Sequence, residues 1–485
     1  MKRFGMSIKP QLVSFFKQPV KAMHYFFPVE TISRELDFRI LLAAMIVESG
    51  DEIYVGQHDL IHSLAARCRG GIYVGKNIFK KRSSAEKGER YYALKDNDID
   101  VVYLHEEGAV FAGSPTDWKE TLRRQYDLSH FRESDKVCDW GQFQQQFDQA
   151  RGCEADVLCT GHPRFDLYKN QYSSYYAPEV SKLSERFGAY VLINGNYGIA
   201  NHGLGVEHVF SDAGNYNPDD ETARLERVAL FTESGKQLLS MVALTHSLSV
   251  KFPDVNFVYR PHPSENPVFY QSVFRGVKNI VVSREGPVGP WILGARALIH
   301  DGCTTAIEAA LANIKVINYK PKLILGYDIW LPNQFGVNVS DEASVADLLN
   351  EDTLRIDSQA CHSAETGPGV YPKPSHLLAN LHLDSFGALL DVIRQTSRAN
   401  SARVIQKRAS NRTITLLAKL HQFRKSLATA KSHVTKSSAA YHRGKFDRFD
   451  FNYIEEKIKI AGEMTNKPLQ FEKLGKDLVR ISKLN

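Results

Sequence analysis

The chain has 485 residues, 43% of them hydrophobic and 24% charged, a composition typical of two or three folded domains that excludes intrinsic disorder and collagen-like repeats. Its longest uninterrupted apolar run, residues 40–47, is far shorter than the roughly 18 residues of a membrane-spanning helix, so we expect none. The basic residues 1–21 lack the apolar centre of a secretory signal, and we expect the chain to stay in the cytoplasm.

Short apolar strands alternate with helical stretches through most of residues 23–350, which predicts parallel sheets with helical crossovers and hence the α/β class. In the first half, strands are predicted at residues 23–29, 52–55, 71–74, 101–104, 136–138 and 157–159, and helices at 37–48 and 58–69. Residues 168–188 lack a buried periodicity, and we interpret them as the connection between two domains.

The second half repeats this alternation. Strands are predicted at residues 190–193, 257–259, 280–282, 297–299 and 316–318, with a long helical region at about 221–252. The sequence therefore predicts two Rossmann-like domains that face a cleft, residues 1–180 and 181–396, followed by a basic helical extension, residues 397–485.

The extension has a net positive charge, whereas the rest of the chain has a net negative charge. Residues 401–485 hold 19 Lys and Arg against 7 Asp and Glu, a net charge of +12, so the first 400 residues have a net charge of −6. This asymmetry predicts a polyanionic partner, either an anionic membrane surface or nucleic acid. The alternative is a solvated helical appendage.

In open parallel sheets, ligands bind beyond the carboxyl ends of the strands. Three segments in that position are dense in polar side chains that can do chemistry: residues 105–108 (His-Glu-Glu-Gly), 260–265 (Arg-Pro-His-Pro-Ser-Glu) and 300–305 (His-Asp-Gly-Cys-Thr-Thr). We expect the site to be built from these segments.

Residues 300–305, which include Asp301, run directly into a predicted helix. Gly302 permits a tight turn, and Thr304 and Thr305 begin a helix whose free N–H groups attract phosphate. Glu308, one turn further along, is placed to accept the sugar hydroxyls of a nucleotide. The alternative is an ordinary N-cap with Glu308 in solvent.

His262 lies between two prolines that fix the backbone. A histidine held in this way can donate a hydrogen bond to a departing phosphate oxygen, and Arg260 and Glu265 flank it as candidate binding residues. The alternative is a structural histidine. The similar pair His162-Pro163 is interpreted as a structural turn near the domain boundary.

Glu106 and Glu107 are adjacent at a strand end, so their side chains point to opposite faces and at most one addresses the cleft directly. That one is a candidate general base whose pKa is raised by partial desolvation in the cleft. The alternative is a solvated acidic loop.

Two further clusters are weaker candidates. Glu30, Arg34 and Asp37 follow the first strand, where Asp37 is either a helix start residue or a cleft residue. Asn194 and Asn196 follow the first strand of the second domain, next to glycines that allow the close approach of a ligand.

Together these segments resemble the two-domain, GT-B-type glycosyltransferases, and more narrowly the bacterial enzymes that use CMP-activated nonulosonic or ulosonic acids. Sialyltransferases of that kind carry an acidic-acidic-Gly motif, a His-Pro motif and a Ser/Thr-rich turn, which here would be Glu106-Glu107-Gly108, His262-Pro263 and Cys303-Thr304-Thr305. Roughly residues 23–325 also look like the surface carbohydrate biosynthesis proteins, through Pro28-Val29-Glu30, residues 161–166 and residues 300–309.

The resemblance implies roles for individual residues. Glu106 or Glu107 would be the base toward the acceptor hydroxyl, and His262 would contact the CMP phosphate. Thr304 and Thr305 would also lie at that phosphate, with Glu308 at the ribose.

Related transferases that retain configuration, those of 3-deoxy-D-manno-octulosonic acid (Kdo), use an aspartate near the start of the second domain. This chain has Asn194 and Asn196 there, although Asp37 could serve instead. We therefore favour direct displacement.

No metal or other cofactor is expected besides the CMP-sugar donor. A single phosphate leaves without needing a divalent ion, the sequence shows no Asp and His cluster, and its six cysteines lack C-x-x-C spacing. The carboxylate of the donor should need a cation, for which Arg34, Arg260 and Lys320 are candidates.

The expected function is transfer of a Kdo-like or sialic-like acid from a CMP-sugar to a surface polysaccharide or its lipid-linked precursor. The basic extension would hold the enzyme at the inner face of the membrane. The alternatives are a CDP-polyol phosphotransferase or UDP-sugar transferase on the same fold, and a non-catalytic glycan-binding subunit. Nucleic acid is the least expected partner.

Overall fold

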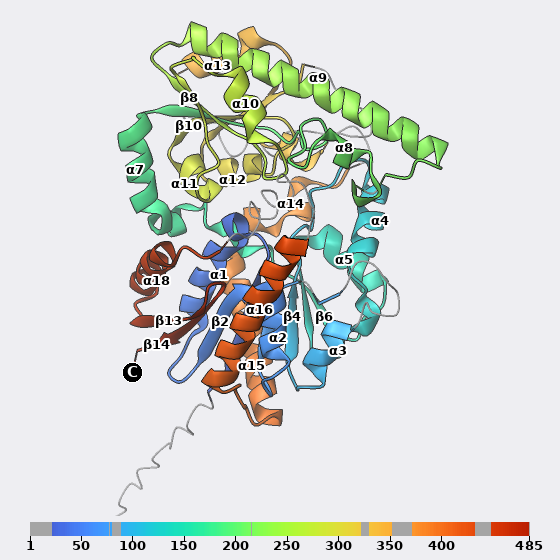
Figure 1. Ribbon diagram of the computed structural model, residues 1–485, viewed down its shortest axis with the longest axis vertical. Helices are drawn as coiled ribbons and strands as arrows, with labels where there is room; N and C mark the ends of the chain where they lie inside the picture. Colours follow the sequence, from blue (N-terminus) through green and yellow to red (C-terminus); the bar gives the residue numbers. More distant parts are fainter. Residues whose placement is uncertain are drawn as a thin grey trace, which may run out of the picture.

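Two β-sheets, one above the other, organise the chain in the computed structural model (Figure 1). The structure describes residues 22–76, 78–79, 89–214, 216–321, 329–351, 371–431 and 448–484. Among these residues, no helix combines the length and the apolar character needed to cross a membrane.

The first sheet forms domain 1 and has the strand order β13-β14-β2-β1-β3-β4-β5-β6. The six strands from β2 to β6 pair in parallel, whereas β13 and β14 form an antiparallel hairpin on β2. Its strands are β1 (His24–Val29), β2 (Glu52–Gln57), β3 (Ile72–Val74), β4 (Asp100–Leu104), β5 (Lys136–Asp139), β6 (Asp156–Cys159), β13 (Leu469–Gly475) and β14 (Leu478–Lys483).

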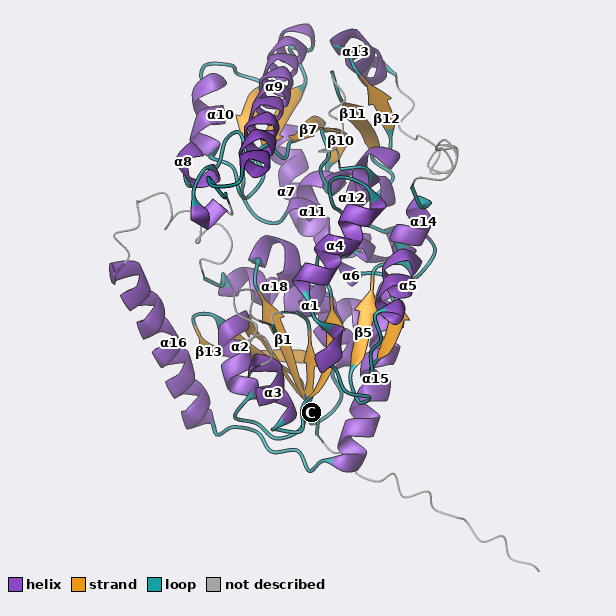
Figure 2. Cartoon of the chain, turned by 90° about the vertical axis from the view of Figure 1, so that its right-hand side faces the viewer, coloured by secondary structure: helices purple, strands orange, loops and turns teal. Residues whose placement is uncertain are grey.

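Helices cover both faces of this sheet (Figure 2), so β1 and β4 are buried along their whole length. Successive residues of β1 serve opposite faces: Phe27 packs in the core with α1, and Phe26 in the core with α2. The helices of domain 1 are α1 (Ile32–Ile46), α2 (His58–Ala65), α3 (Glu89–Lys95), α4 (Pro115–Gln125), α5 (Gln142–Ala150), α6 (Pro163–Asp166), α15 (Ser385–Arg403), α16 (Asn411–Lys431) and α18 (Phe451–Thr465).

The second sheet forms domain 2 and is parallel throughout, with the order β12-β11-β10-β7-β8-β9. Its strands are β7 (Tyr190–Asn194), β8 (Asn256–Arg260), β9 (Ile280–Val282), β10 (Ala295–His300), β11 (Lys315–Tyr319) and β12 (Val337–Val339). Its helices are α8 (Val206–Val209), α9 (Glu221–Lys251), α10 (Pro267–Val273), α11 (Val288–Leu293), α12 (Thr305–Leu311) and α13 (Glu342–Asn350).

Both strand orders are those of doubly wound sheets. In domain 2 the order reverses between β7 and β10, and in domain 1 between β1 and β3. Such switch points open a crevice at the carboxyl ends of the strands, where ligands bind. The predicted α/β class with two Rossmann-like domains is confirmed.

The connection between the domains differs from the prediction in one respect. Residues 168–188 form the 3₁₀ helix η2 (Asn170–Tyr176) and the helix α7 (Ala177–Phe187), and Tyr175 and Tyr176 of η2 are buried. The absence of helical periodicity misled the prediction because the apolar contacts come from tyrosines, which the sequence pattern had counted as polar.

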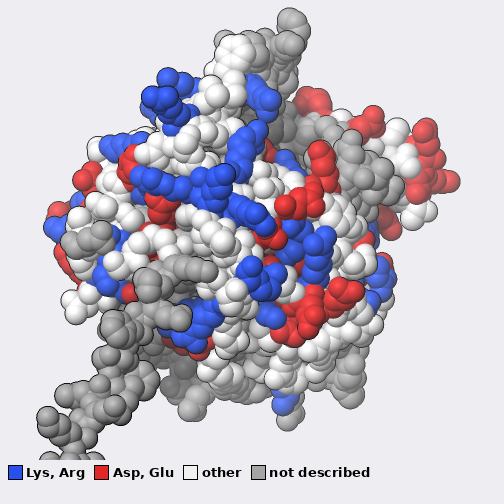
Figure 3. Space-filling model, turned by 90° about the horizontal axis from the view of Figure 1, so that it is seen from below, with Lys and Arg blue, Asp and Glu red and all other residues white. Residues whose placement is uncertain are grey.

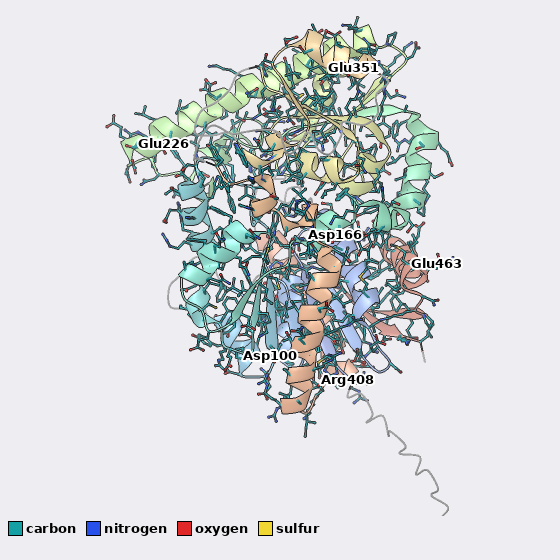
Figure 4. The ribbon with its side chains drawn as sticks, turned by 180° about the vertical axis from the view of Figure 1, so that it is seen from behind. Asp100, Asp166, Glu226, Glu351, Arg408 and Glu463 are labelled. Carbon is teal, nitrogen blue, oxygen red and sulfur yellow. The ribbon has the colours of Figure 1, made fainter. Side chains whose placement is uncertain are left out.

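The chain returns to domain 1 through α14 (Pro374–Leu377) and the 3₁₀ helix η6 (Ala379–Leu381), followed by α15. Asp166, labelled in Figure 4, holds this return in place. Its carboxylate accepts hydrogen bonds from the Asn380 side chain and from the backbone N–H groups of Ser385 and Phe386. The predicted helical extension beyond residue 397 is confirmed for α16 and α18, but it is not helical throughout, since β13 and β14 extend the first sheet.

Candidate active site between the two domains

The carboxyl edges of the two sheets face each other. Ala112, in the loop after β4, forms an isolated bridge with Ile329 of domain 2. At a second point, Arg164 at the start of α6 lies against Glu308 of α12, with 3.8 Å between Nε and Oε1. The two switch-point crevices therefore open toward a common cleft.

A pocket of about 390 Å³ lies at the switch point of domain 2. Its walls come from the segments after β7, β8, β10 and β11, from one side of α9, and from Ala112 of domain 1. The lining residues are Ala112, Asn196, Tyr197, Gly198, Ile199, His202, Leu230, Ser234, Gln237, Ser264, Asp301, Gly302, Lys320 and Ile329.

Four residues that the sequence predicted for binding line this pocket: Asn196, Asp301, Gly302 and Lys320. Gly302 has φ = +61°, a left-handed conformation that favours glycine and turns the chain sharply after β10. Lys320 Nζ lies 3.9 Å from Asp301 Oδ1, so the pocket combines one ammonium group with one carboxylate.

The turn beside the pocket is less open than the sequence suggested. Asn194 Nδ2 donates to Thr305 Oγ1 over 3.0 Å, which buries both residues behind the turn. Thr304 makes no side-chain cap, and the N–H groups of Ala306 and Ile307 already donate to backbone carbonyls. These contacts argue against a simple N-cap, and of this turn only Asp301 and Gly302 line the pocket.

His262 is held beside this pocket by its neighbours. Its Nδ1 lies 2.7 Å from Ser264 Oγ and accepts from the Ser264 N–H, while its own N–H donates to Glu265. Because Nδ1 accepts a backbone hydrogen bond, the proton of the neutral ring is assigned to Nε2. Ser264 itself lines the pocket, so the strand-end segments of β8 and β10 do converge.

Glu265 and Arg260, predicted as ligand contacts, are engaged within domain 2. Glu265 is buried, and its carboxylate accepts from the Tyr197 N–H and from the hydroxyl of Tyr270; burial raises its pKa. Arg260 donates to the carbonyl groups of Glu285 and Gly286. Both residues shape the loops instead of facing a ligand.

Charged side chains gather at the β1/β3 switch point of domain 1. Lys76, two residues after β3, lies 3.1 Å from the carboxylate of Glu30, directly after β1. Burial lowers the pKa of Lys76, but the carboxylates of Glu35, Glu106 and Glu30 outweigh it, so the pKa is raised and the ammonium is kept charged.

Glu106 and Glu107 point in opposite directions, as predicted. Glu106 is fully buried, with Arg39 Nη2 at 3.1 Å and His162 Nε2 at 3.2 Å. Glu107 is 38% exposed and accepts from Arg34 Nη1 at 2.5 Å. This geometry argues against Glu106 as the base and leaves Glu107 as the candidate.

The expectation of a raised pKa at the base is wrong for Glu107. Burial raises its pKa, but Arg34, Arg164 and Lys76 together outweigh burial and lower it. Glu107 is therefore ionised at neutral pH, and its ability to take a proton depends on how firmly Arg34 holds it.

Asp37 does not face the cleft, contrary to the prediction. Its carboxylate accepts 2.8 Å hydrogen bonds from the hydroxyl groups of Tyr176 and Tyr453, and only 4% of the residue is exposed. Asp37 of α1 thus binds both η2, in the connection between the domains, and α18. Its carboxylate is enclosed by these contacts, which argues against Asp37 as a nucleophile.

Glu308 was expected at a ribose, but it is buried at the domain interface against Arg164. Burial raises its pKa to about 7, although the charges of Arg164 and Arg34 oppose this shift. Arg164 was missed because the motif of residues 161–166 was interpreted as structural. The structural interpretation holds for His162, which is buried and accepts from the Arg164 N–H at the start of α6. It does not hold for the Arg164 side chain, which contacts domain 2.

Lys76 and Tyr197 were also missed, and Ser264 lies in the predicted segment 260–265 but was not singled out there. Lys76 and Tyr197 each follow a strand within three positions, so a stricter use of the strand-end rule would have found them. Within the described ranges, no group of three or more His, Cys, Asp or Glu side chains is placed to hold a metal ion.

No protein-family model matches the chain, and no curated protein matches it. Among solved structures it is similar to the wall teichoic acid polymerase TagF soaked with CDPG, at 9% identity and a TM-score of 0.44, over 78% of this chain and 89% of that one. It is also similar to the Methanocaldococcus jannaschii UDP-GlcNAc 2-epimerase with UDP-GlcNAc and UDP, at 10% identity and a TM-score of 0.39, over 70% of this chain and 97% of that one. A third is S. aureus MnaA with UDP, at 11% identity and a TM-score of 0.39, over 77% of this chain and 95% of that one.

Proposed function

We propose that the protein is a transferase that takes a Kdo-like or sialic-like acid from a CMP-sugar bound at the domain 2 pocket. The acceptor, a hydroxyl group of a surface glycan or its lipid-linked precursor, lies at the domain 1 crevice. One observation carries the proposal: the pocket at the β7/β10 switch point includes Ala112, which belongs to the same loop of domain 1 as Glu107.

The charges in the pocket support a donor with a single phosphate. Among the described lining residues, the permanent charges are one ammonium, on Lys320, and one carboxylate, on Asp301. A nucleoside diphosphate would bring a second phosphate without a matching cation in these walls. A nucleoside monophosphate needs only hydrogen-bond donors and one cation, for which we assign the backbone of Asp301 and Gly302 and the ammonium group of Lys320.

Arg34 is the best-placed cation for the donor's own carboxylate. It is 34% exposed and already holds a carboxylate, that of Glu107, in a short ion pair. Arg260 already donates hydrogen bonds to two backbone carbonyl groups. Lys320 lies in the part of the pocket that we assign to the phosphate. When Arg34 pairs with the carboxylate of the sugar acid instead of Glu107, the pKa of Glu107 would rise, which would let Glu107 take the proton of the acceptor hydroxyl.

The reaction is then a direct displacement. The acceptor oxygen bonds to the anomeric carbon while its proton passes to Glu107, and the carbon–oxygen bond to the phosphate breaks with its electron pair leaving on CMP. His262, whose Nε2 carries the ring proton, donates a hydrogen bond to the departing phosphate oxygen. Asp37 takes no part because its carboxylate is enclosed by tyrosines.

Calorimetric titration with CMP, CDP and UDP tests the donor. We expect the tightest binding for CMP, and at least a tenfold weaker binding in Lys320→Ala, since a buried charge contact contributes about 1.5–3 kcal/mol. Lys251→Ala, at the exposed end of α9, is the matched control and should bind as the wild type.

A CMP-release assay over a set of CMP-sugars tests the reaction. Release that is lost in Glu107→Gln supports the transferase. Preference for CDP or UDP would instead favour a CDP-polyol phosphotransferase or a UDP-sugar transferase. Binding of a glycan without release from any activated donor would identify a non-catalytic binding subunit.

A further inference from the structure

Helix α16 has a second apolar face that no described residue covers. Ile414 and Ala418 are buried in the core that includes Leu60 and Leu64 of α2. Leu416, Leu420 and Phe423 lie elsewhere on the helix and are 57%, 44% and 60% exposed. Their spacing, i, i+4 and i+7, places them in one stripe along the helix.

Positive charges flank this stripe. Arg412 and Lys419 lie on one side of it by helical position and Arg424 on the other, all three are exposed, and none has an ion pair with a described carboxylate. The cations just before the amino-terminal end of α16 differ, since Arg403 is paired with Asp100 and Arg408 with Glu52. Figure 3 views that end, where Lys and Arg lie close to Asp and Glu.

A pocket of about 340 Å³ adjoins α16 on the Lys419 side. It lies between α16, the first residue of α18 and the end of β13. Its lining residues are Thr415, Ala418, Lys419, Gln422, Phe451, Lys473, Leu474, Gly475 and Lys476. Three of these are lysines and none is acidic, and the Lys473 ammonium lies 4.9 Å from the centroid of the Phe451 ring.

We propose that this face, made of α16 and the three-lysine pocket, docks on an anionic lipid bilayer. Leu416, Leu420 and Phe423 enter the boundary between headgroups and acyl chains, and the pocket takes the phosphate of a lipid headgroup. An apolar stripe with basic flanks is the pattern of a helix that lies in a membrane interface.

Charge favours this occupant over two basic segments of the chain, residues 1–21 and 432–447. Residues 1–21 hold five Lys and Arg and no Asp or Glu, and residues 432–447 hold three against one. Both segments would repel a basic face, whereas an anionic bilayer attracts it.

The position of α16 connects this surface with the cleft. The helix runs along the outer flank of domain 1 (Figure 2). Midway along the helix, His421 Nε2 lies 3.9 Å from Asp477 Oδ2, and the Asp477 carbonyl accepts from the N–H of Gln57, the last residue of β2. The docked face therefore ends beside the carboxyl edge of the first sheet. If the proposed transfer is correct, a lipid-linked acceptor would reach the cleft from this side.

Vesicle co-sedimentation of the full chain tests the docking. With vesicles of phosphatidylcholine containing about 30 mol% phosphatidylglycerol at about 0.1 M salt, we expect binding at least tenfold tighter than to pure phosphatidylcholine. Lys419→Glu/Lys473→Glu/Lys476→Glu should abolish this preference. Leu416→Ser/Leu420→Ser/Phe423→Ser should weaken binding to both kinds of vesicle at least tenfold.

The matched control is Leu225→Ser/Val228→Ser/Leu239→Ser, which alters equally exposed apolar residues of α9 and should bind as the wild type. Equal binding to neutral and anionic vesicles, or unchanged binding of the α16 variants, would overturn the proposal. So would tighter binding to a lipid-free duplex DNA or RNA than to the anionic vesicles. CMP release with an acceptor in solution is measured separately, so loss of the transferase hypothesis would leave the docking result intact.

Discussion

Arg164 of domain 1 and Glu308 of domain 2 meet across the domain interface, with 3.8 Å between Nε and Oε1 and about 95% of each side chain buried. The contact joins the segment after β6 to the first turn of α12, a helix that begins beside the domain 2 pocket. Protonation of Glu308 therefore changes the charge balance between the two domains next to the proposed site.

The first prediction concerns pH. Because burial raises the pKa of Glu308 to about 7, the folded state binds the proton more tightly than the unfolded state, whose pKa is the ordinary one near 4.5. The contribution to the free energy of unfolding is thus complete below about pH 4.5 and is lost as the pH rises to about 7, by roughly 3 kcal/mol at most. Glu308→Gln should remove this dependence.

Urea unfolding at intervals between pH 4.5 and 8 measures this pH dependence, as the difference in the free energy of unfolding between the wild type and Glu308→Gln. Glu351→Gln, an exposed glutamate at the end of α13, serves as the control and should follow the wild type. A difference that is flat with pH would show that Glu308 titrates normally.

The second prediction separates the two adjacent glutamates. Glu106→Gln leaves the buried Arg39 without its counter-charge, and removing one partner of a buried ion pair costs about 3–5 kcal/mol. Glu107→Gln removes a partly exposed pair with Arg34, which should cost less than about 1 kcal/mol. Denaturant unfolding followed by circular dichroism gives both values.

Activity should rank the same variants in the opposite way. Glu107→Gln keeps its fold and loses CMP release, whereas any folded Glu106→Gln retains turnover within a few-fold. The reverse ranking would assign the base to Glu106 and contradict the proposed site.

The strand-end rule explains how much of this site the sequence could predict. Gly302, Asp301 and Asn196 were found because the carboxyl ends of β7 and β10 meet at one edge of a parallel sheet. Lys320 was named only as a cation for a carboxylate, and it lies at the same edge after β11. The alternation at Glu106 and Glu107 followed equally from the pleat of β4. Local geometry was sufficient in these cases.

Burial set by distant partners could not be predicted. Asp37 is covered by Tyr176 and Tyr453, which lie 139 and 416 residues further along the chain. The Arg164–Glu308 contact likewise depends on how the domains pack. The hairpin of β13 and β14 was hidden in the sequence because Lys473, Lys476 and Arg480 interrupt its apolar residues.

The third prediction concerns Asp37. Burial raises its pKa, while Lys457 and the two tyrosine hydroxyls oppose the shift. Asp37→Asn should lower the free energy of unfolding by about 1–2 kcal/mol, because one amide group replaces an oxygen that accepts from tyrosine. The turnover number should change less than about twofold, since no part of the proposed displacement uses this carboxylate. A folded Asp37→Asn protein with a hundredfold lower rate of CMP release would restore Asp37 as a nucleophile.

The fourth prediction concerns His262. Ser264 and Glu265 fix the orientation of its ring beside the pocket, and a positioned hydrogen-bond donor to a leaving group contributes about 10² to 10⁴-fold to the rate. His262→Ala should therefore lower turnover by that factor while the CMP dissociation constant changes less than about tenfold, because the contact strengthens mainly as charge develops on the phosphate. Ser264→Ala, which keeps the imidazole but removes the hydroxyl group at 2.7 Å, should cost much less. His376→Ala, an exposed histidine of α14, is the control for loss of an imidazole elsewhere. Single-turnover kinetics separate the chemical step from product release, and an unchanged rate in His262→Ala would remove this residue from the mechanism.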